Sequence, residues 1–526
     1  MLLVTAEQMR KIDQVMIEEV GVPAVALMEL AGVAVADVVA AKLATGRERI
    51  DIVAGKGHNG ADGLAAARHL LARGYDVRVW LAYGESSLAA LTSAQLRSYR
   101  ALGGALAGAE DDLSDSDLIV DALLGTGSRL PLASTVKLFA MAMAKAGKRV
   151  IAVDLPTGLD ADTGLLDDVA IRAEATVTYG FGKPGLYQLP GRQHAGDVVV
   201  ADLSMPDALA VGVGAKTFLM TAPDCAERYR VRAVDSHKGT FGRVGVVAGS
   251  DGMYGAARLA VQGAYRAGAG LVYYFAPDSL NAAVCQSFPQ ETVIRRHPGA
   301  DDSWNTERVR SCAKFLGAVS CGLCGPGLGP QFVRLASEQP GALLPFAEAD
   351  LPLVLDADFL QALARLPKEG LADFFLRRRQ ATVITPHPKE FSALTGLSVQ
   401  DVQSDRVRRA AEFAERYGVY VVLKGAATVT AAPDGAAFIN TTGNSGLASG
   451  GAGDVLAGLA AGLLASGYAA LDAALLAVYA HGLAGDLACA GTESEESLVA
   501  SDLLQWTGRA FRQISRAMDK VTGALT

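Results

Sequence analysis

The stretch NSGLASGGAGDVLAG, residues 444–458, decides the fold of the second half of the chain. Three glycines within four residues leave backbone N–H groups uncovered, and an apolar helical pattern begins at Val455. Because a helix N-terminus is electropositive, the stretch predicts a site for an anion such as a phosphoryl group in transfer. Asp454 would repel a phosphate, so we interpret it as a base that takes a proton from an attacking hydroxyl. The alternative is a flexible loop with Asp454 as the helix N-cap.

Composition and charge limit the class of protein. The chain has 526 residues, enough for more than one domain, and its 50% apolar and 6% aromatic content with 58 glycines is typical of an α/β protein. The net charge is −8, without a long run of one sign. We therefore expect small-molecule substrates, with no nucleic-acid and no membrane partner.

The sequence shows no export or membrane signal. The start, MLLVTAEQMRKIDQ, carries charges where a signal peptide needs an apolar core. The apolar region 458–485 is interrupted by Asp472 and His481, which favours buried helices over a membrane span. Six cysteines are scattered, and Cys321 and Cys324 form one CxxC without a second pair, so zinc is not expected. A cytoplasmic location with reduced thiols follows.

The first half alternates strands and helices. Helical spacing covers residues 5–43, with a break at 21–23. Strand patterns follow at 50–55, 77–83, 117–125 and 149–158, with helices at 64–73 and 133–146. Parallel strands with short loops at their carboxyl ends predict a doubly wound sheet with its site along those ends.

A glycine-rich turn follows the first of these strands. Residues 55–60 fit GxGxxG, and Glu85 lies just beyond the next strand, so a Rossmann NAD site is an alternative. Asn59 and Asp62 lie inside the turn, where an acid would oppose a pyrophosphate. This favours a different ligand.

Two further strands of the first half end in polar residues. Asp121 ends one, and Asp154 with Thr157 ends another. Together with Asn59 they supply oxygen ligands for a hard cation and one carboxylate for proton transfer. The alternative is that Asp121 and Asp154 only cap turns.

The chain divides near residues 207–224, where no pattern of helix length is present and a linker is expected. We predict domains at 1–210 and 220–518. The second half restarts the β–α–β rhythm at 237–260, 272–275, 318–329, 351–360, 381–394 and 419–431. Its strand ends carry acids, a histidine and a lysine that could neutralise nucleotide phosphates: Asp356, Asp358, His387, Glu390 and Lys424.

These motifs resemble a known family in both halves. The first half resembles the NAD(P)H-hydrate epimerases, and the second resembles the ADP/ATP-dependent NAD(P)H-hydrate dehydratases of the ribokinase-like superfamily. The matching stretches in the first half are AEQMRKID (6–13), GVPAVALMELAG (21–32), GKGHNGADG (55–63), DALLGTG (121–127) and DLPTGLDADTG (154–164). Those in the second are HKG (237–239), YGAA (254–257), GPGLG (325–329), LDAD (355–358), TPHPKEF (385–391), VLKGAATV (422–429) and residues 444–458.

The resemblance implies a fold and a pair of activities. It implies an N-terminal Rossmann-like three-layer sandwich and a C-terminal ribokinase-like domain, both α/β and doubly wound. The first would epimerise hydrated NADH or NADPH at C6. The second would phosphorylate the hydroxyl of the S-hydrate with ADP or ATP and Mg²⁺, and then eliminate phosphate. A homo-oligomer is expected.

The resemblance also implies site residues. Asp154 and Asp454 would be catalytic, and K⁺ would be held by Asn59, Asp121 and Thr157. The hydrate would contact His58, Asn59, Gly60, Ala61, Asp62, Gly125, Thr126, Gly127, Ser128, Arg129, Leu130, Pro131 and Asp154 in the first domain, and Ala256, Gly327, His387 and Asp454 in the second. The nucleotide would contact Lys424, Gly425, Ala426, Ala427, Thr428 and Gly453.

The chain departs from the family pattern at a few positions. Leu30 replaces an Asn, Ala61 replaces a Gly, and Lys389 replaces a Gly. The Leu30 and Ala61 changes bear on the epimerase. Alternatives are a vitamin or sugar kinase with a non-catalytic dinucleotide-binding module, and a Rossmann dehydrogenase. The motifs do not distinguish ADP from ATP, or the NADH hydrate from the NADPH hydrate.

Overall fold

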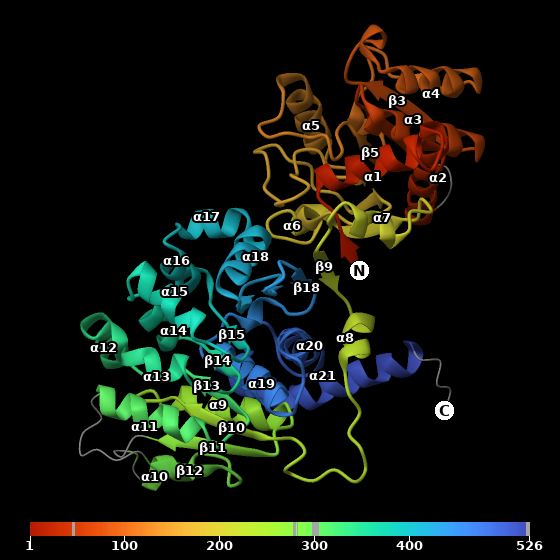
Figure 1. Ribbon diagram of the computed structural model, residues 1–526. Coiled ribbons are helices and arrows are strands. Elements are labelled where there is room, and N and C mark those ends of the chain that lie inside the picture. Colours follow the sequence, from red (N-terminus) through yellow and green to blue (C-terminus); the bar gives the residue numbers. More distant parts are fainter. Residues whose placement is uncertain (45–47, 277–279, 281, 297–303, 522–526) are drawn as a thin grey trace. The chain divides into compact units, whose positions relative to one another are not determined.

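The computed structural model describes residues 1–44, 48–276, 280, 282–296 and 304–521. The chain forms two compact units, Leu2–Thr217 and Phe218–Thr526, with Met1 counted in the second (Figure 1). The boundary between the units falls within the junction expected at 207–224, but this segment is folded and is not a plain linker. The segment forms α7 (Asp207–Gly212), β9 (Thr217–Met220) and α8 (Ala222–Arg228), because Phe218 stacks on Phe438 at 4.9 Å and its neighbour Leu219 is buried.

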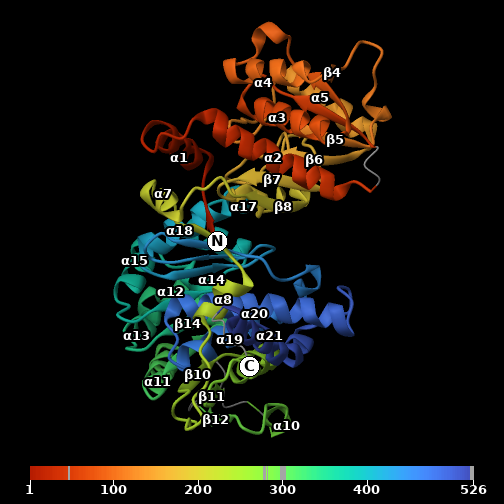
Figure 2. The same ribbon diagram turned by 90° about the vertical axis from the view of Figure 1, so that its right-hand side faces the viewer.

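The N-terminal unit is built on a parallel sheet of strand order β4-β3-β2-β5-β6-β7-β8, which confirms the doubly wound prediction. Its strands are β2 (Arg49–Ala54), β3 (Asp76–Leu81), β4 (Ala105–Leu106), β5 (Leu118–Ala122), β6 (Arg149–Val153), β7 (Ala175–Tyr179) and β8 (Asp197–Ala201), preceded in the chain by β1 (Leu2–Leu3). Its helices are α1 (Ala6–Glu18), α2 (Ala24–Lys42), α3 (His58–Ala72), α4 (Ala90–Ala101), α5 (Ser134–Ala146), α6 (Arg192–Ala195) and the α7 already described. Short 3₁₀ turns lie at 85–87, 113–115 and 184–186. Helix α3 packs on one face of the sheet, where Gly63 meets Ile52, and α5 packs with Val53 on the other (Figure 2).

The glycine-rich turn of the first half is largely helical. We expect a helix from residue 64, but α3 begins at His58. A Cβ atom on Gly60 would lie 2.0 Å from the Gly55 carbonyl oxygen, and one on Gly63 would lie 2.3 Å from the Ala122 Cβ. The glycines therefore bring the helix N-terminus against the strands, and the helix starts earlier than its apolar pattern.

The C-terminal unit has a larger sheet with the order β9-β18-β17-β16-β15-β14-β13-β10-β11-β12, parallel from β16 to β12 and antiparallel at β16-β17-β18. The remaining strands are β10 (Arg243–Val247), β11 (Leu271–Ala276), β12 (Val293–Arg296), β13 (Cys321–Cys324), β14 (Leu353–Leu355), β15 (Thr382–Ile384), β16 (Tyr420–Leu423), β17 (Val429–Ala431) and β18 (Ala437–Asn440).

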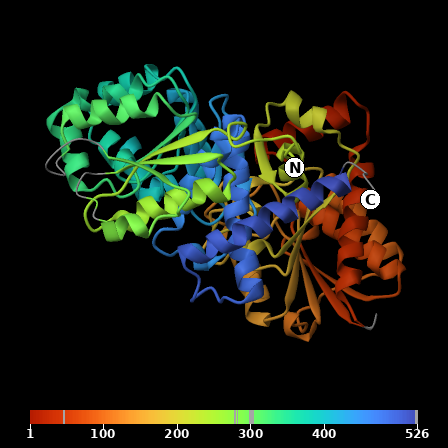
Figure 3. The same cartoon turned by 90° about the horizontal axis from the view of Figure 1, so that it is seen from below.

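Helices cover both faces of this sheet, as a doubly wound fold requires (Figures 1 and 3). One face carries α11 (Thr306–Leu316), α12 (Pro330–Glu338), α13 (Leu344–Ala347), α14 (Asp358–Leu363), α15 (Lys368–Leu376), α16 (Pro388–Thr395), α17 (Val399–Ser404) and α18 (Arg406–Tyr417). The other carries α9 (Tyr254–Arg266), α19 (Ala452–Ala465), α20 (Ala470–Gly491) and α21 (Ala500–Val521). Helix α10 (Ala282–Gln286) and 3₁₀ turns at 340–343 and 445–447 complete the unit.

In the part of the chain that the structure describes, two helices are long and apolar enough to cross a membrane, α2 and α20. In α20 the apolar window is 78% buried inside the unit, and in α2 it is 39% buried. The burial of α20 agrees with the expectation of core helices in the region 458–485. His481 belongs to this core, because its ring contacts the Ala452 carbonyl oxygen at 2.9 Å and burial lowers its pKa to about 4.

Helix α19 lies unusually close to α9. A Cβ atom on Gly458 would lie 2.3 Å from the Ala260 carbonyl oxygen, and one on Gly263 would lie 2.6 Å from the Val455 carbonyl oxygen. Backbone therefore packs on backbone, and this contact positions the helix that carries Asp454.

We predict that Gly458→Ala destabilises the C-terminal unit by about 1–3 kcal/mol, because the methyl group has no space between the helices. Gly508→Ala is the control: a Cβ atom there would meet no atom within 4 Å, and alanine favours the helix by about 0.5–1 kcal/mol. Chemical denaturation measures both. Equal stability of the two variants would contradict the close packing.

Candidate active sites

The N-terminal unit contains a cavity of ≈ 600 Å³ at the carboxyl ends of β2, β5, β6 and β7. Its wall includes five groups of predicted site residues: His58, Asn59, Asp62, the turn Gly125–Gly127 and Asp154. Parallel strands end at the same edge of a sheet, which is why residues so far apart in sequence meet here.

Asp154 is held in place from three sides. Its backbone has φ 64°, a left-handed conformation just after β6. The amide N–H of Thr126 donates to its Oδ2 at 2.8 Å, and the Lys183 Nζ lies 3.0 Å from its Oδ1. Lys183 is completely buried and also donates to the Thr178 hydroxyl at 2.8 Å. The ion pair holds the Asp154 carboxyl group at the wall of the cavity.

Three cavity residues, Asp13, Tyr179 and Lys183, are absent from our sequence prediction. Burial raises the pKa of Asp13 to about 6, with Lys183 opposing and Asp154 adding to the shift. Burial, Asp154 and Asp13 raise the pKa of Asp62 well above its usual range. The cavity wall thus combines the Asp154–Lys183 pair with two carboxyl groups, those of Asp13 and Asp62, whose pKa values are raised. The signal that could have found Lys183 is a single charge within the otherwise uncharged segment 175–191.

Asp121 and Thr157 lie together, as predicted. The Thr157 hydroxyl donates to Asp121 Oδ1 at 2.8 Å, and its amide donates to Oδ2 at 2.7 Å. Asp121 is fully buried, and burial raises its pKa to about 6, against the effect of these hydrogen bonds. Asn59 lies on the cavity wall, and its Oδ1 would lie 2.9 Å from a Cβ atom on Gly125.

Other predicted substrate contacts lie elsewhere in the described part of the unit. Ala61 is buried against Met28 and Ala65, and its methyl group does not face the cavity. Leu30 is 45% exposed on α2 and does not line the cavity, although its neighbours do. The two departures from the family pattern therefore leave the cavity wall unchanged. Gly60 and residues 128–131 are likewise outside the wall described here.

In the C-terminal unit, Asp454 lies in the first turn of α19. The N-cap is Gly451, with φ 91° and no side-chain hydrogen bond, so the interpretation of Asp454 as the N-cap is wrong. Among the described hydrogen bonds, none uses the amide of Gly453 or Asp454 as donor. These free N–H groups at the positive end of the helix can bind an anion.

A charged cluster surrounds Asp454. The Lys424 Nζ lies 2.7 Å from Asp356 Oδ1 and 4.0 Å from Glu390 Oε2. Burial raises the pKa of Asp454 to about 7, with Asp356 adding to the shift and Lys424 opposing it. Burial likewise raises the pKa of Glu390 to about 7. Asp454 can therefore gain and lose a proton near neutral pH, as a general base requires.

The remaining predicted substrate contacts of this unit are His387, Gly327 and Ala256. His387 is the N-cap of α16, where its Nδ1 accepts the amides of Lys389 and Glu390 at 3.1 Å, and a cavity of ≈ 450 Å³ includes His387 and Glu390. A Cβ atom on Gly327 would lie 3.2 Å from the Ala256 Cβ, so these two residues are neighbours.

Side-chain hydrogen bonds to backbone carbonyl oxygens hold the loop 424–428 in place. Buried Arg406 donates to the carbonyl oxygens of Leu423 at 2.8 Å and Lys424 at 3.3 Å. The Thr428 hydroxyl donates to the Gly425 carbonyl oxygen at 2.8 Å. Both contacts hold the loop that carries the predicted nucleotide contacts.

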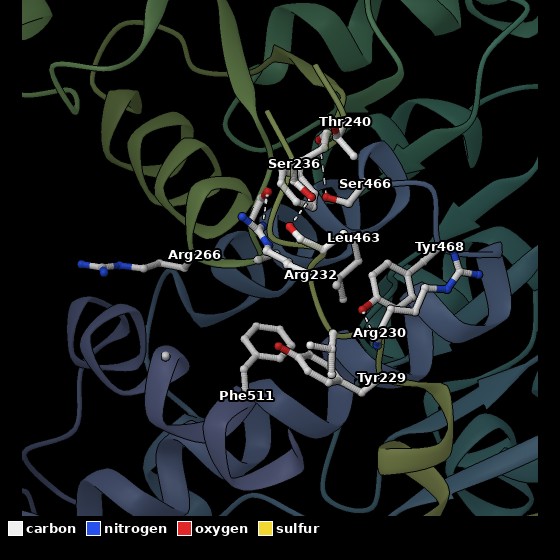
Figure 4. Close-up of a pocket in the computed structure, with 16 residues that line it drawn as sticks. Tyr229, Arg230, Arg232, Ser236, Thr240, Arg266, Leu463, Ser466, Tyr468 and Phe511 are labelled. Carbon is white, nitrogen blue, oxygen red and sulfur yellow. Dashed lines mark hydrogen bonds between the residues drawn. The ribbon is translucent and has the colours of Figure 1, made fainter. Parts of the chain in front are cut away.

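A further hollow of ≈ 390 Å³ lies beside Phe511 and the end of α19 (Figure 4). Arg230 and Arg232 on its wall donate to the carbonyl oxygens of Gly467 and Gly268, and Arg266 points away from it. None of the predicted catalytic or nucleotide-binding residues lines it, so the chemistry belongs to the sites above.

Known proteins match the chain along its whole length. Residues 244–505 match the family model described as NAD(P)H-hydrate dehydratase, and residues 24–185 match the one described as YjeF-related protein N-terminus. The bifunctional NAD(P)H-hydrate repair enzyme of Moorella thermoacetica is 35% identical over 100% of this chain and 99% of its own length. The chain belongs to this family.

The chain is also similar to other known proteins. The bifunctional NAD(P)H-hydrate repair enzyme of Escherichia coli K12 is 34% identical, over 86% of this chain and 83% of its own. Among solved structures, the ADP/ATP-dependent NAD(P)H-hydrate dehydratase of Bacillus subtilis, co-crystallised with ATP/Mg²⁺, is 31% identical with a TM-score of 0.47 and covers 56% of this chain and 98% of that one.

Membership of the family gives the function. The protein repairs hydrated NADH and NADPH as an epimerase fused to an ADP/ATP-dependent dehydratase, which confirms the sequence prediction. The kinase alternative with a non-catalytic first domain is not favoured. A Rossmann NAD site would need an acid beyond the second strand to bind the ribose hydroxyl. Glu85, the candidate, is exposed and forms an ion pair with Arg100, which disfavours this alternative.

We predict that Lys424→Met raises the pKa values of Asp454 and Glu390 further above about 7, since the lysine charge lowers both. Lys389→Met is the control, because Lys389 is exposed and is not among the main causes of either shift. NMR of ¹³C-labelled carboxyl groups, assigned with Asp454→Asn, measures the titrations. A midpoint for Asp454 near the ordinary carboxyl value in the unmodified protein would contradict the cluster.

Proposed function

We propose that each unit performs its reaction at the carboxylate described above: epimerisation at Asp154 and dehydration at Asp454. The observation that supports the first is the Asp154–Lys183 pair at the wall of a ≈ 600 Å³ cavity. The hydrated nicotinamide would lie in this cavity, and the backbone of the turn Gly125–Gly127 would face its phosphates. Asp154 would take the proton of the C6 hydroxyl.

In the second unit, the hydrate would lie against Ala256, Gly327 and His387. Asp454 would accept the proton of the C6 hydroxyl as that oxygen attacks the terminal phosphoryl group of ADP or ATP. The amides at the start of α19 would stabilise the charge on the transferring group. The phosphate would then leave with the C6–O bonding electrons, and loss of the C5 proton would restore the reduced nicotinamide.

The nucleotide would occupy the loop 424–428 and Gly453. A Cβ atom on Gly453 would lie 3.3 Å from the Lys424 Nζ, so a larger residue would crowd the lysine. Mg²⁺ would neutralise phosphate charge when bound with the nucleotide. Asp356 and Glu390 fit this ion, because Mg²⁺ in such sites takes one or two carboxylates in addition to phosphate oxygens.

Two variants separate the two reactions. With a mixture of both hydrate epimers, Mg²⁺ and ADP or ATP, the unmodified protein should restore all of the reduced nicotinamide absorbance. Asp454→Asn should restore almost none, with a loss of about 10²–10⁴ in rate. Asp154→Asn should consume the S-hydrate at the normal rate and stall on the R-hydrate.

The result that contradicts the Asp154 assignment is full recovery by Asp154→Asn. Normal turnover of the S-hydrate by Asp454→Asn would refute the base assigned to the second unit. The repair assignment itself fails if the unmodified protein restores no absorbance with either nucleotide.

We also propose that K⁺ binds the oxygens of Asn59, Asp121 and Thr157. Asp121 supports this, because no lysine or arginine within the described residues contributes to its pKa shift. A fully buried carboxylate is costly unless an opposite charge lies nearby. The ion would supply that charge and fix the strand ends beside Asp154.

K⁺ should therefore stabilise the N-terminal unit against heat more than Na⁺ does, with Tm rising by about 2–8 °C per kcal/mol of binding. Asp121→Asn should abolish this difference, because the amide carries no charge. Asp115→Asn, at an exposed carboxylate of the same unit, is the control. Equal Tm values in the two salts would refute the K⁺ site.

A cytoplasmic location and self-association are further proposals. All six cysteines are free thiols, which supports a reducing compartment. Val20, Val25 and Leu30 expose apolar side chains around the start of α2, which supports a contact between copies of the chain.

A further inference from the structure

One face of helix α1 forms part of the wall of the N-terminal cavity. The residues of α1 that line the cavity are Met9, Arg10, Asp13 and Ile17. Their spacing of three and four residues places them on the same side of the helix. Asp13 supplies the carboxyl group of this face, and it ends the stretch AEQMRKID, a motif to which the proposed function gives no role.

The fold gives the Asp13 carboxyl group no partner. Within the described residues this group accepts no hydrogen bond and forms no ion pair, although the side chain is partly buried. Its oxygens keep accessible surface on the cavity wall, so a molecule in the cavity can reach them. Burying a carboxyl group without a partner costs stability. An apolar residue would avoid this cost between Met9 and Ile17, so folding alone does not account for Asp13.

Asp13 lies within electrostatic range of the Asp154–Lys183 pair. Burial raises the pKa of Asp13 to about 6, the positive charge of Lys183 lowers it, and the negative charge of Asp154 raises it. A carboxyl group with such a pKa can both give and take a proton near neutral pH, as acid–base catalysis requires.

Lys183 is not a free proton donor in this cavity. Its Nζ lies 3.0 Å from Asp154 Oδ1, and it donates to the Thr178 hydroxyl at 2.8 Å and to the Tyr179 carbonyl oxygen at 3.1 Å. These three contacts occupy the three N–H bonds of the ammonium group. A second group that exchanges a proton with the substrate is therefore sought among the other residues of the wall.

We propose that Asp13 is a second catalytic residue of the epimerase, whose carboxyl group gives a proton to the ring nitrogen N1 of the hydrate as Asp154 takes the proton of the C6 hydroxyl. The role rests on the epimerisation proposed above for this cavity. Two groups are needed because ring opening removes one proton from oxygen and adds another to nitrogen.

The step balances without an external reagent. The hydroxyl proton moves to Asp154, the C6–O bond becomes a carbonyl, and the C6–N1 bond breaks with its electron pair on N1, which takes the proton of Asp13. Rotation about the C5–C6 bond presents the other face of the carbonyl to N1. Ring closure then returns the N1 proton to Asp13 and the Asp154 proton to oxygen, which gives the opposite epimer.

Asp13→Asn tests the proposal, because it keeps the size of the side chain and removes the carboxyl group that transfers the proton. We expect the kcat for conversion of the R-hydrate to the S-hydrate to fall about 10²–10⁴-fold, the usual contribution of general acid–base catalysis. Tm should stay unchanged or rise, since the carboxyl group has no partner to lose. Dehydration of the pure S-hydrate by the same chain is the internal control and should keep its rate.

Glu18→Gln is the matched control, since Glu18 is an exposed carboxyl group of α1 that does not line the cavity. It should epimerise at the normal rate. A normal rate in Asp13→Asn would overturn the proposal, and so would a lost rate accompanied by a lower Tm, because Asp13 would then serve the fold. Failure of the unmodified protein to epimerise would instead refute the function of the unit.

Discussion

Each unit is organised by a lysine that pairs with a buried aspartate at the end of a parallel strand. A buried charge is stable only beside an opposite charge, so Lys183 with Asp154, and Lys424 with Asp356, fix where the strand ends converge. The sheets bring these pairs together with further acids whose pKa values are raised by burial. In the C-terminal unit one of these acids is Asp454, the base that we propose for dehydration.

The predictable part of the fold was its alternation of elements. Strand and helix patterns are local, so the parallel sheets and the polar residues at their ends could be inferred before any contact was known. Asp121 with Thr157, and Lys424 with Glu390, meet because they follow neighbouring strands. Lys183 left only one signal, a single charge in an otherwise uncharged segment, because its importance comes from its burial and from its partner Asp154, which is distant in sequence.

The wrong expectations share one physical cause. Glycine has a weak helical preference, so glycine-rich segments look like loops, yet α3 begins at His58 and α19 at Ala452. In both cases tertiary packing decided the conformation, because absent side chains allow the helix to approach its neighbour. The same packing turns the Ala61 methyl group toward α2 and away from the cavity, which no pattern along the sequence could reveal.

The contact between α9 and α19 fixes the distance between the first turns of these two helices. Helix α9 carries Ala256 near its first residue, and α19 carries Asp454 near its own. Where Gly458 meets the Ala260 carbonyl oxygen, no side chain can change rotamer between the two helices. The distance between Ala256, which we expect to contact the substrate, and Asp454 is therefore set by the contact of one helix backbone with the other.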